Sequence, residues 1–232
     1  MTAVNAQELV IETGNAGPVS GLLTRPRQAR ACFVFAHGAG AGMTHPFMAK
    51  VAAGLGERGI ATLRYQFPYM EKGSKRPDQP SVAHAAVRAA VAEAVRCCGA
   101  LPLIAGGKSF GGRMTSQAQA IAPLAGVHGL AFFGFPLHPA GKPSNDRAKH
   151  LADVHVPMLF LQGTRDTLAE LTLLEPVVKG LGSKGLGSSA TLHPVRDADH
   201  SFHVLARSGR NDGEVMGEIL DAFVAWAGAI AR

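Results

Sequence analysis

The chain has 232 residues, of which 47% are hydrophobic and 17% charged, which is enough apolar material for a large core and excludes a disordered chain. This length is within the range that α/β proteins fill as one domain, so a single domain over residues 1–232 is expected. The formal charge is +6 at pH 7, but the 23 lysines and arginines are scattered, with no run beyond pairs such as Lys75-Arg76, which favours a solvated surface over nucleic-acid binding.

The cysteines and the amino-terminal segment bear on the cellular compartment. Cys32, Cys97 and Cys98 are odd in number and two are adjacent, which is not the pattern of a disulfide framework and favours a reducing compartment. Residues 1–14 lack the basic start and apolar stretch of a signal peptide. The longest apolar stretches are strand-sized, whereas a membrane span needs ~20 residues. A cytoplasmic protein without membrane association is predicted.

The chain opens with a predicted β-hairpin and then alternates between strands and helices. Residues 7–13 and 19–26 form the hairpin, joined through a glycine-containing turn. Afterwards, short apolar runs alternate with segments that carry apolar residues at helical spacing. In chain order the predicted elements are strand and glycine-rich loop 31–40, helix 47–59, strand 60–68, polar loop 69–80, helix 81–99, strand 101–107, helix 110–122, strand 127–137, strand 157–166, helix 167–181 with a step at Pro176, strand 188–195 and helix 211–232.

This order predicts the fold class. Strands that are near-continuous apolar runs, separated by helices, are typical of a mostly parallel sheet with helices on both faces, a three-layer α/β arrangement. Ligands of such sheets bind at the carboxyl ends of the strands. The glycine-rich segment 179–189 is interpreted as a connection, not a domain boundary. Residues 138–156 are too few for a lid domain, so an open pocket for small substrates is expected.

Residues 107–109, Gly-Lys-Ser, fit two different motifs. A phosphate-binding loop needs G-x-x-x-x-G-K-[ST], because backbone N–H groups must wrap the phosphates from a glycine-pivoted turn. The first glycine would stand at position 102, but Pro102 has no N–H to donate, so nucleotide binding is disfavoured. Residues 107–111 instead match G-x-S-x-G between a predicted strand and a predicted helix, the context of a nucleophile elbow. Ser109 is therefore the candidate nucleophile.

A serine nucleophile needs a base, and the base needs an orienting carboxylate. In this architecture the expected order is Ser, then Asp or Glu, then His, each at a strand end. Asp166 ends the strand 157–166, and His200 lies in the loop after the last strand, so both fit. Asp197 and Asp199 also lie near His200, but neighbours in sequence rarely point at each other, and Asp166 is favoured.

Two other histidines compete with His200 for the role of base. His193 falls within the predicted strand 188–195, and His203 lies three residues after His200, on a following turn. The H-x-x-H spacing of His200 and His203 could in principle hold a metal ion, but no third ligand is evident. His200 is favoured as the base, and no metal site is expected.

Acyl transfer also needs two N–H donors that stabilise a negatively charged oxygen. One is expected from Phe110, the residue after the nucleophile. The other is expected from Ala39, with Gly40 as the alternative. These two residues follow His37 and Gly38 in a run that resembles the H-G-x-x element of esterases, so the start of this loop is also expected to contact the substrate.

Further residues are candidates for the wall of the pocket. The aromatic segment 64–70, with Tyr65, could form such a wall or pack as an ordinary loop. His138 and His45 could line the site, although a structural role is favoured for each. Lys108, beside the nucleophile, could attract an acidic substrate or point to solvent.

These motifs resemble the α/β-hydrolase superfamily from about Leu9 onward. The segments that carry the resemblance are HGAGAGMTHPFM, GGKSFGGRM, FFGFPLHPAGKP, FLQGTRD and DADHSF. They resemble a small lidless branch whose bacterial members are described as α/β-hydrolases or dienelactone-hydrolase-like proteins. Its eukaryotic relatives include a testis-expressed group and a subunit of a histone acetyltransferase complex. The resemblance implies the α/β-hydrolase fold, and Ser109, Asp166 and His200 match the triad positions. True dienelactone hydrolases carry a cysteine nucleophile, where this chain has serine.

The sequence therefore predicts a serine hydrolase of carboxylesterase type. It would cleave a small or short-chain ester, or a related acyl compound, through an acyl-enzyme, without a metal or organic cofactor. The expected partner is this small molecule, with no nucleic acid and no membrane, and a homodimer is left open. Two alternatives remain: a non-catalytic interaction scaffold on the same fold, and an acyltransferase or peptidase that uses the same residues.

Overall fold

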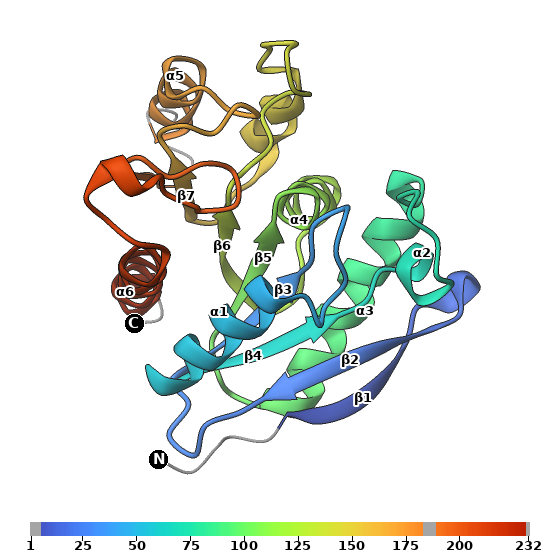
Figure 1. The fold of residues 1–232 in the computed structure, drawn as a ribbon. Helices are drawn as coiled ribbons and strands as arrows, with labels where there is room; N and C mark the ends of the chain where they lie inside the picture. Colours follow the sequence, from blue (N-terminus) through green and yellow to red (C-terminus); the bar gives the residue numbers. More distant parts are fainter. Residues whose placement is uncertain (1–5, 183–188, 231–232) are drawn as a thin grey trace.

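An eight-stranded sheet forms the centre of the computed structural model, which describes residues 6–182 and 189–230 (Figure 1). The strand order is β1-β2-β4-β3-β5-β6-β7-β8. β2 pairs antiparallel with β1 and with β4, and the remaining neighbours are parallel, which confirms the predicted mostly parallel sheet. The strands span Gln7–Glu12 (β1), Pro18–Thr24 (β2), Ala31–Ala36 (β3), Ile60–Tyr65 (β4), Leu103–Lys108 (β5), Val127–Phe133 (β6), Met158–Gly163 (β7) and Ala190–Val195 (β8).

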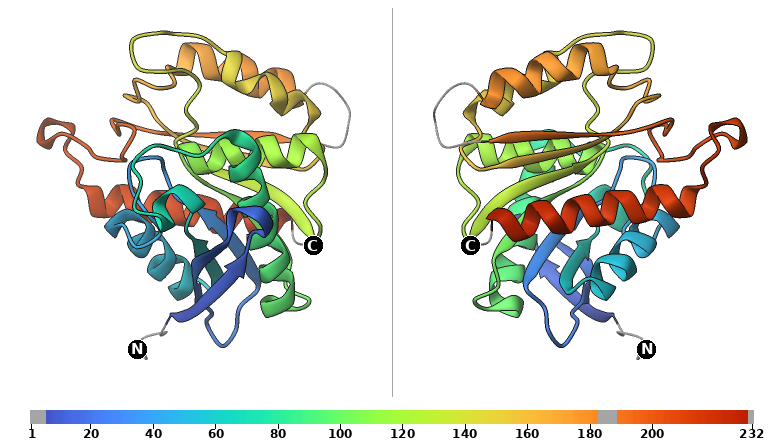
Figure 2. Two further views of the ribbon diagram at one scale, coloured as in Figure 1. Left: turned by 90° about the vertical axis from the view of Figure 1, so that its right-hand side faces the viewer. Right: turned by 90° about the vertical axis from the view of Figure 1, so that its left-hand side faces the viewer.

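Helices cover both faces of the sheet, as predicted. α1 and α6 contact each other on one face, while α3 and α4 contact each other on the opposite face (Figure 2). α5 packs against β8. The α-helices span Pro46–Glu57 (α1), Pro68–Glu71 (α2), Pro80–Cys98 (α3), Phe110–Ile121 (α4), Leu171–Gly182 (α5) and Asp212–Ile230 (α6), and the 3₁₀ segments span Gly14–Ala16 (η1), Asp146–Asp153 (η2) and Ala206–Ser208 (η3).

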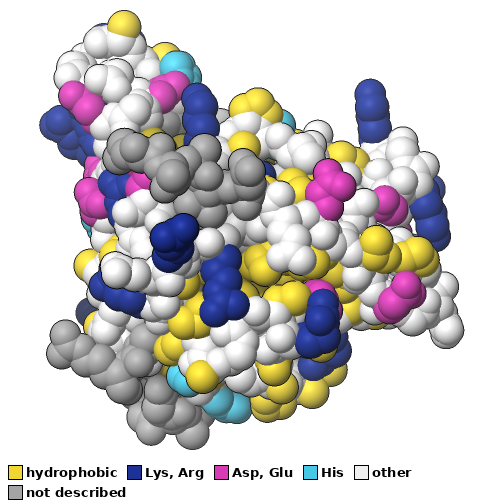
Figure 3. Space-filling model, turned by 90° about the horizontal axis from the view of Figure 1, so that it is seen from below, with side chains coloured by type: hydrophobic (Ala, Val, Ile, Leu, Met, Phe, Trp, Pro, Cys, Tyr) yellow, Lys and Arg dark blue, Asp and Glu magenta, His cyan; other side chains and the backbone are white. Residues whose placement is uncertain are grey.

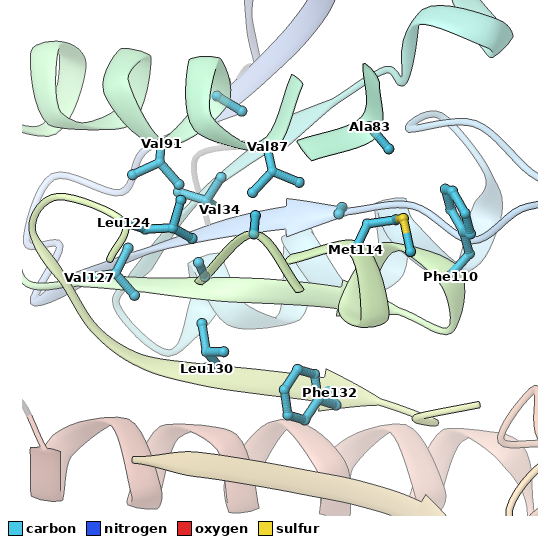
Figure 4. Packing of buried hydrophobic residues seen from close by; sticks show 14 of the residues in the cluster. Val34, Ala83, Val87, Val91, Phe110, Met114, Leu124, Val127, Leu130 and Phe132 are labelled. Carbon is cyan, nitrogen blue, oxygen red and sulfur yellow. The ribbon is translucent and has the colours of Figure 1, made fainter. Parts of the chain in front are cut away.

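The central strand β3 is buried on both faces because its side chains alternate between two apolar clusters. Phe33 and Phe35 belong to the cluster that α1 and α6 complete. Val34 points the other way, toward Val87 and Val91 of α3 (Figure 4). This double burial explains why the strand appears in the sequence as a continuous apolar run.

Two connections that were predicted as loops contain short helices. The predicted loop 69–80 overlaps α2, where the carboxylate of Glu71 accepts hydrogen bonds from the N–H and hydroxyl of Ser20 at 2.9 and 2.8 Å. The connection between β6 and β7 contains η2 and, throughout its described length, no larger inserted helical unit, in agreement with the predicted lack of a large lid. Most of the predicted connection 179–189 lies outside the described residues.

Charged side chains on the surface are dispersed. On the face shown in Figure 3, lysines and arginines are separated by apolar and neutral atoms, with acidic side chains among them. Some are paired, as in the ion pair between Arg58 and Asp221 at 2.7 Å. Among the described helices, none combines the length and apolar character that crossing a membrane requires.

The parallel strands bring several of the predicted site residues to one edge of the sheet. Ser109 directly follows β5, and His37 directly follows β3. Asp166 comes three residues after β7, and His200 five residues after β8. Because the carboxyl ends of parallel neighbours lie at the same edge, side chains far apart in sequence can meet there.

Candidate active site

Ser109 occupies a sharp turn between β5 and α4. Its backbone angles, φ 50° and ψ −115°, fall in a region that non-glycine residues rarely adopt. Two glycines allow the turn to pack closely. A Cβ on Gly107 would lie 2.5 Å from the carbonyl oxygen of Ala36, and one on Gly111 would lie 2.5 Å from that of His37. The G-x-S-x-G spacing thus corresponds to close approaches that only glycine permits.

A chain of hydrogen bonds links Ser109, His200 and Asp166. The Nε2 atom of His200 lies 2.9 Å from the Ser109 hydroxyl oxygen, and its Nδ1 atom lies 2.6 Å from Oδ2 of Asp166. The Asp166 side chain is fully buried, whereas that of His200 is 23% exposed. A carboxylate at Nδ1 keeps the proton on that nitrogen and leaves Nε2 free to accept the serine proton.

The carboxylate of Asp166 is held by two further donors. The side-chain amide of Gln162 donates to Oδ2 at 2.5 Å, and the N–H of Leu168 donates to Oδ1 at 2.8 Å. Gln162 is itself fixed, because its Oε1 accepts the N–H of Phe135 at 2.9 Å. Our sequence reasoning missed Gln162, although a glutamine inside a buried apolar strand is a signal that its amide has a specific partner.

The competing acids near His200 have other partners, and the carboxylate of Asp197 lies 3.6 Å from Nε of Arg196. Oδ1 of Asp199 accepts the N–H groups of Ser201 and His203 at 2.7 and 3.0 Å, which shapes the loop that carries His200. Asp197 takes a left-handed conformation, with φ 61°, and its carbonyl accepts from Arg165 at 3.1 Å. Neither carboxylate forms a hydrogen bond to His200 in the described structure.

The competing histidines also lie away from the nucleophile. His193 is on β8 and pairs with Glu218 on α6 at 3.0 Å. His203 pairs with Asp212 at 2.9 Å. Among residues 6–182 and 189–230, no group of three or more histidine, cysteine, aspartate or glutamate side chains is arranged to hold a metal ion.

Two backbone N–H groups beside Ser109 have no protein acceptor in the described structure, those of Phe110 and Ala39. Both residues line a cleft that also contains the Ser109 side chain. Gly40, the alternative donor, also has no acceptor among the described residues for its N–H group, and it lines another cleft that reaches Ser109. Unbonded backbone donors beside a nucleophile are suited to stabilise a negatively charged oxygen, and Phe110 is in addition the first residue of α4.

His37 supports the loop that follows β3 and is fully buried. Its Nε2 accepts the N–H of Phe67 at 3.0 Å, so the proton is on Nδ1, which donates to the carbonyl of Gly38 at 2.7 Å. Burial lowers the pKa of this imidazole to about 4. The expected substrate contact of His37 is therefore corrected to a structural role, whereas Gly38 does line the cleft.

Lys108 points neither to solvent nor to a carboxylate. Its Nζ donates to the backbone carbonyl of His200 at 2.7 Å and lies 6.0 and 5.7 Å from the ring centres of Phe47 and Phe202. Burial lowers the pKa of this amine to about 8, and the charges of Asp166 and Asp199 oppose that shift. The lysine thus connects the nucleophile turn to the loop that carries His200.

Two clefts meet at Ser109. The first, of about 460 Å³, is lined by Gly38, Phe47, Lys108, His200 and neighbouring residues, with His45 at its edge. The second, of about 380 Å³, is lined by Ser109, Phe110 and residues of α4 and of the β6–β7 connection. A carbonyl compound bound at Ser109 would have one substituent on each side of its carbonyl carbon, and the two clefts provide space for both.

A comparison with protein families identifies the chain. A family model described as an alpha/beta hydrolase domain matches residues 29–228. The chain belongs to this α/β-hydrolase family. The predicted superfamily and fold are thereby confirmed, with the eight-stranded sheet and no large lid in the described residues.

Solved structures show the same fold at low identity. A dienelactone hydrolase from Anabaena variabilis is 20% identical, with a TM-score of 0.77 over 98% of this chain and 100% of its own. A lidless α/β serine hydrolase from Xanthomonas campestris is 18% identical, with a TM-score of 0.70 over 97% of each chain. An α/β serine hydrolase homologue from Coxiella burnetii is 17% identical, with a TM-score of 0.73 over 97% of this chain and 99% of its own.

Within this α/β-hydrolase, two candidates for the pocket wall lie in the core, and for His138 this agrees with the structural role that the sequence favoured. Tyr65 is fully buried and packs edge-on against Phe67. His138 is also fully buried, between the carbonyl of Pro139 and the carboxylate of Glu170. Neither is among the residues that line the two clefts. Tyr65 is the last residue of β4, and His138 lies in the connection after β6, where its ring nitrogens contact Pro139 and Glu170.

A second serine–histidine pair has a different geometry. Ser116 lies inside α4, is fully buried, and donates its hydroxyl proton to the carbonyl of Arg113 at 3.0 Å. The 2.8 Å contact with Nε2 of His150 therefore requires the imidazole to donate. Burial lowers the pKa of His150 to about 4, and the charge of Arg113 adds to this. Ser116 has no access to a substrate, so this pair is structural.

Proposed function

We propose that this protein is a serine hydrolase that cleaves small or short-chain esters through an acyl-enzyme. One observation carries the proposal, the chain of hydrogen bonds from Asp166 through His200 to Ser109. A buried carboxylate, an imidazole and a hydroxyl in this order convert a weak nucleophile into a strong one. The strained backbone of Ser109 supports it further, since such strain is typical of functional positions.

The first half of the reaction forms the acyl-enzyme. The Ser109 oxygen attacks the ester carbonyl while His200 Nε2 accepts the hydroxyl proton. The carbonyl oxygen becomes negative, and the N–H groups of Phe110 and Ala39, which have no acceptor in the described protein, stabilise it. One such donor is typically worth ~3 kcal/mol in the transition state. His200 then returns the proton to the leaving alcohol as its bond to the carbonyl carbon breaks.

The second half releases the acid. Water replaces the alcohol, His200 accepts a proton from it, and the resulting hydroxide attacks the acyl carbon. Collapse of this intermediate breaks the bond to Ser109, which regains its proton from His200. Asp166 stabilises the imidazolium in both halves without accepting a proton.

The size of the clefts favours short substrates. The first cleft has a volume of about 460 Å³ and the second about 380 Å³. Beside them, the described β6–β7 connection adds only the 3₁₀ segment η2. Many substrates with long acyl chains are bound under a lid, and the described β6–β7 connection forms no large lid. Small or short-chain esters are therefore the proposed substrates.

The proposal is tested with a fluorophosphonate probe. Activated serines displace fluoride from phosphorus and retain the phosphonyl group, so we expect one adduct, on the peptide that contains Ser109. Ser109→Ala should abolish labelling, and His200→Ala should slow it by a factor of about 100 or more. Intact and peptide mass spectrometry measure both.

Ser201→Ala is the matched control for this labelling. Ser201 lines the same cleft as Ser109 and is exposed, but it has no histidine partner among the described residues. The control variant should be labelled at the wild-type rate. A folded wild-type protein that forms no adduct would contradict the hydrolase and favour a non-catalytic scaffold. An alcohol or amine that captures the acyl group faster than water would indicate an acyltransferase.

A further inference from the structure

The second cleft at Ser109 contains two arginines without acidic partners. Arg113 and Arg147 both line this cleft, together with Ser109 and Phe110. Neither arginine forms an ion pair in the described part of the chain. The Nε atom of Arg113 is buried and has no hydrogen-bond partner there. A buried unbonded guanidinium nitrogen is unusual, because burial removes water without replacing it.

The surroundings of Arg113 disfavour its positive charge. The residue lies in the first turn of α4, one turn after Ser109, where the helix dipole repels cations. Burial lowers the pKa of Arg113, and the charge of Arg147 adds to this shift. The nearby imidazoles of His84 and His150 carry no negative charge that could balance Arg113. Burial and the charge of Arg113 lower the pKa of both. These costs are offset when an anion binds between the two arginines.

The cleft has one acidic side chain, and this one is engaged elsewhere. Oδ2 of Asp78 accepts the N–H of Tyr69 at 2.9 Å. The guanidinium of Arg113 instead lies 5.8 Å from the ring centre of Phe110, which holds it near the nucleophile. Ser109 and Arg113 are four positions apart, which corresponds to about one helical turn of ~6 Å, so both residues lie at the same end of α4 and line the same cleft.

We propose that Arg113 and Arg147 bind an oxyanion group of the substrate, a carboxylate or a phosphate, so that the enzyme prefers short esters with an acidic group at one end. This inference rests on the proposed hydrolase function for its catalytic part. The planar guanidinium groups supply paired N–H donors that match the oxygens of such an anion. Sequence patterns do not reveal this site, because the two arginines are 34 positions apart.

The catalytic test compares two esters of equal chain length, monoethyl glutarate and ethyl pentanoate. The first carries a carboxylate where the second has a methyl group. We expect kcat/KM to be at least tenfold higher for monoethyl glutarate, because a hydrogen bond between charged groups changes affinity by a factor of about 10 to 100. Arg113→Gln and Arg147→Gln should each remove most of this preference and change ethyl pentanoate hydrolysis less than twofold.

Two further variants make this result specific. Lys142→Gln removes one positive charge from the same β6–β7 connection, at an exposed position outside the cleft, and should leave both esters unaffected. Arg113→Lys keeps the charge but loses the paired donors, and should retain part of the preference. Equal rates on both esters in the wild type, or equal losses on both in the glutamine variants, would overturn the inference.

A binding experiment separates this inference from the proposed function. Ser109→Ala is titrated calorimetrically with glutarate and, separately, with inorganic phosphate, and the tighter ligand identifies the kind of oxyanion. We expect binding that Arg113→Gln weakens about tenfold and that higher salt weakens too. Binding without fluorophosphonate labelling of the wild type would support the anion site and reject the hydrolase. Labelling without binding of either anion would support the hydrolase and reject the anion site.

Discussion

At the scale of single residues, the site depends on side chains whose partners are backbone groups. Lys108 is the clearest case. Its place in the G-x-S-x-G motif suggested a substrate contact or an exposed charge, whereas its amine binds the carbonyl of His200. The contact joins two segments that are 92 positions apart. Lysine is suited to this role, since a flexible stem between two aromatic rings ends in a donor that reaches one carbonyl.

Replacing Lys108 with methionine tests this connection. The apolar stem remains, but the His200 loop loses its anchor, and a small misplacement of a catalytic group lowers the rate sharply. We expect kcat for ethyl pentanoate to fall about tenfold or more, with KM changed less than threefold. Steady-state kinetics measure both, and Lys142→Met is the control. An unchanged kcat would show that the loop keeps its position without the lysine.

At the scale of elements, glycines allow the turn from β5 to α4 to pack closely against β3 and β6. A Cβ on Gly106 would lie 1.9 Å from the carbonyl oxygen of Ala131, and one on Gly112 would lie 2.9 Å from that of Gly107. The glycines that flank the motif are thus a packing requirement, because the helix must start close to the sheet for Ser109 to reach the edge.

Alanine at Gly111 should expose this requirement. Its Cβ would lie 2.5 and 2.6 Å from the carbonyl oxygens of His37 and Ala36. We expect the free energy of unfolding to fall by about 3 kcal/mol or more, as in other overpacked sites. Gly217→Ala on α6 is the matched control, with open space around the new Cβ, and should stabilise by ~0.5–1 kcal/mol. Urea unfolding measures both, and equal effects would contradict the packing argument.

The elements themselves were largely predictable. The predicted strands and helices are present, because buried strands and amphipathic helices leave periodic apolar patterns. The main errors concerned the positions at which the elements begin and end. The strand predicted over 127–137 ends at Phe133, because Gly134 turns left-handed with φ 71°. The helix α2 has only four residues, too few for a periodic signal.

At the scale of the whole molecule, buried neutral histidines connect stability to pH. His37 is fully buried, and its folded-state pKa is about 4 against 6.5 for an unperturbed imidazole. Above pH 6.5 both states are neutral, so the full stability is present. Between pH 6.5 and 4 the unfolded chain takes up the proton and the folded chain does not, so stability falls as the solution becomes more acidic. His150 shifts in the same direction.

This linkage predicts that acid weakens the fold well above the pKa of the carboxylates. At pH 5 the His37 contribution should have fallen by about 2 kcal/mol. In His37→Gln the difference in unfolding free energy between pH 7.5 and pH 5 should shrink by about this amount. His128→Gln, at an exposed position of β6, serves as the control. The same pH difference in His37→Gln and wild type would show that the imidazole is protonated in the folded state.

The sequence by itself determined the order of elements, the elbow around Ser109 and the positions of Asp166 and His200 after their strands. The periodicity of apolar residues, the spacing of glycines and the order of the motifs are all visible along the chain without knowledge of the fold. Only the tertiary structure decided which groups meet. It buried Tyr65 and His138, set Gln162 against Asp166, and placed Arg113 and Arg147 in one cleft. Side-chain direction depends on turns and on neighbouring strands from distant segments, and these contacts leave no periodic trace in the sequence.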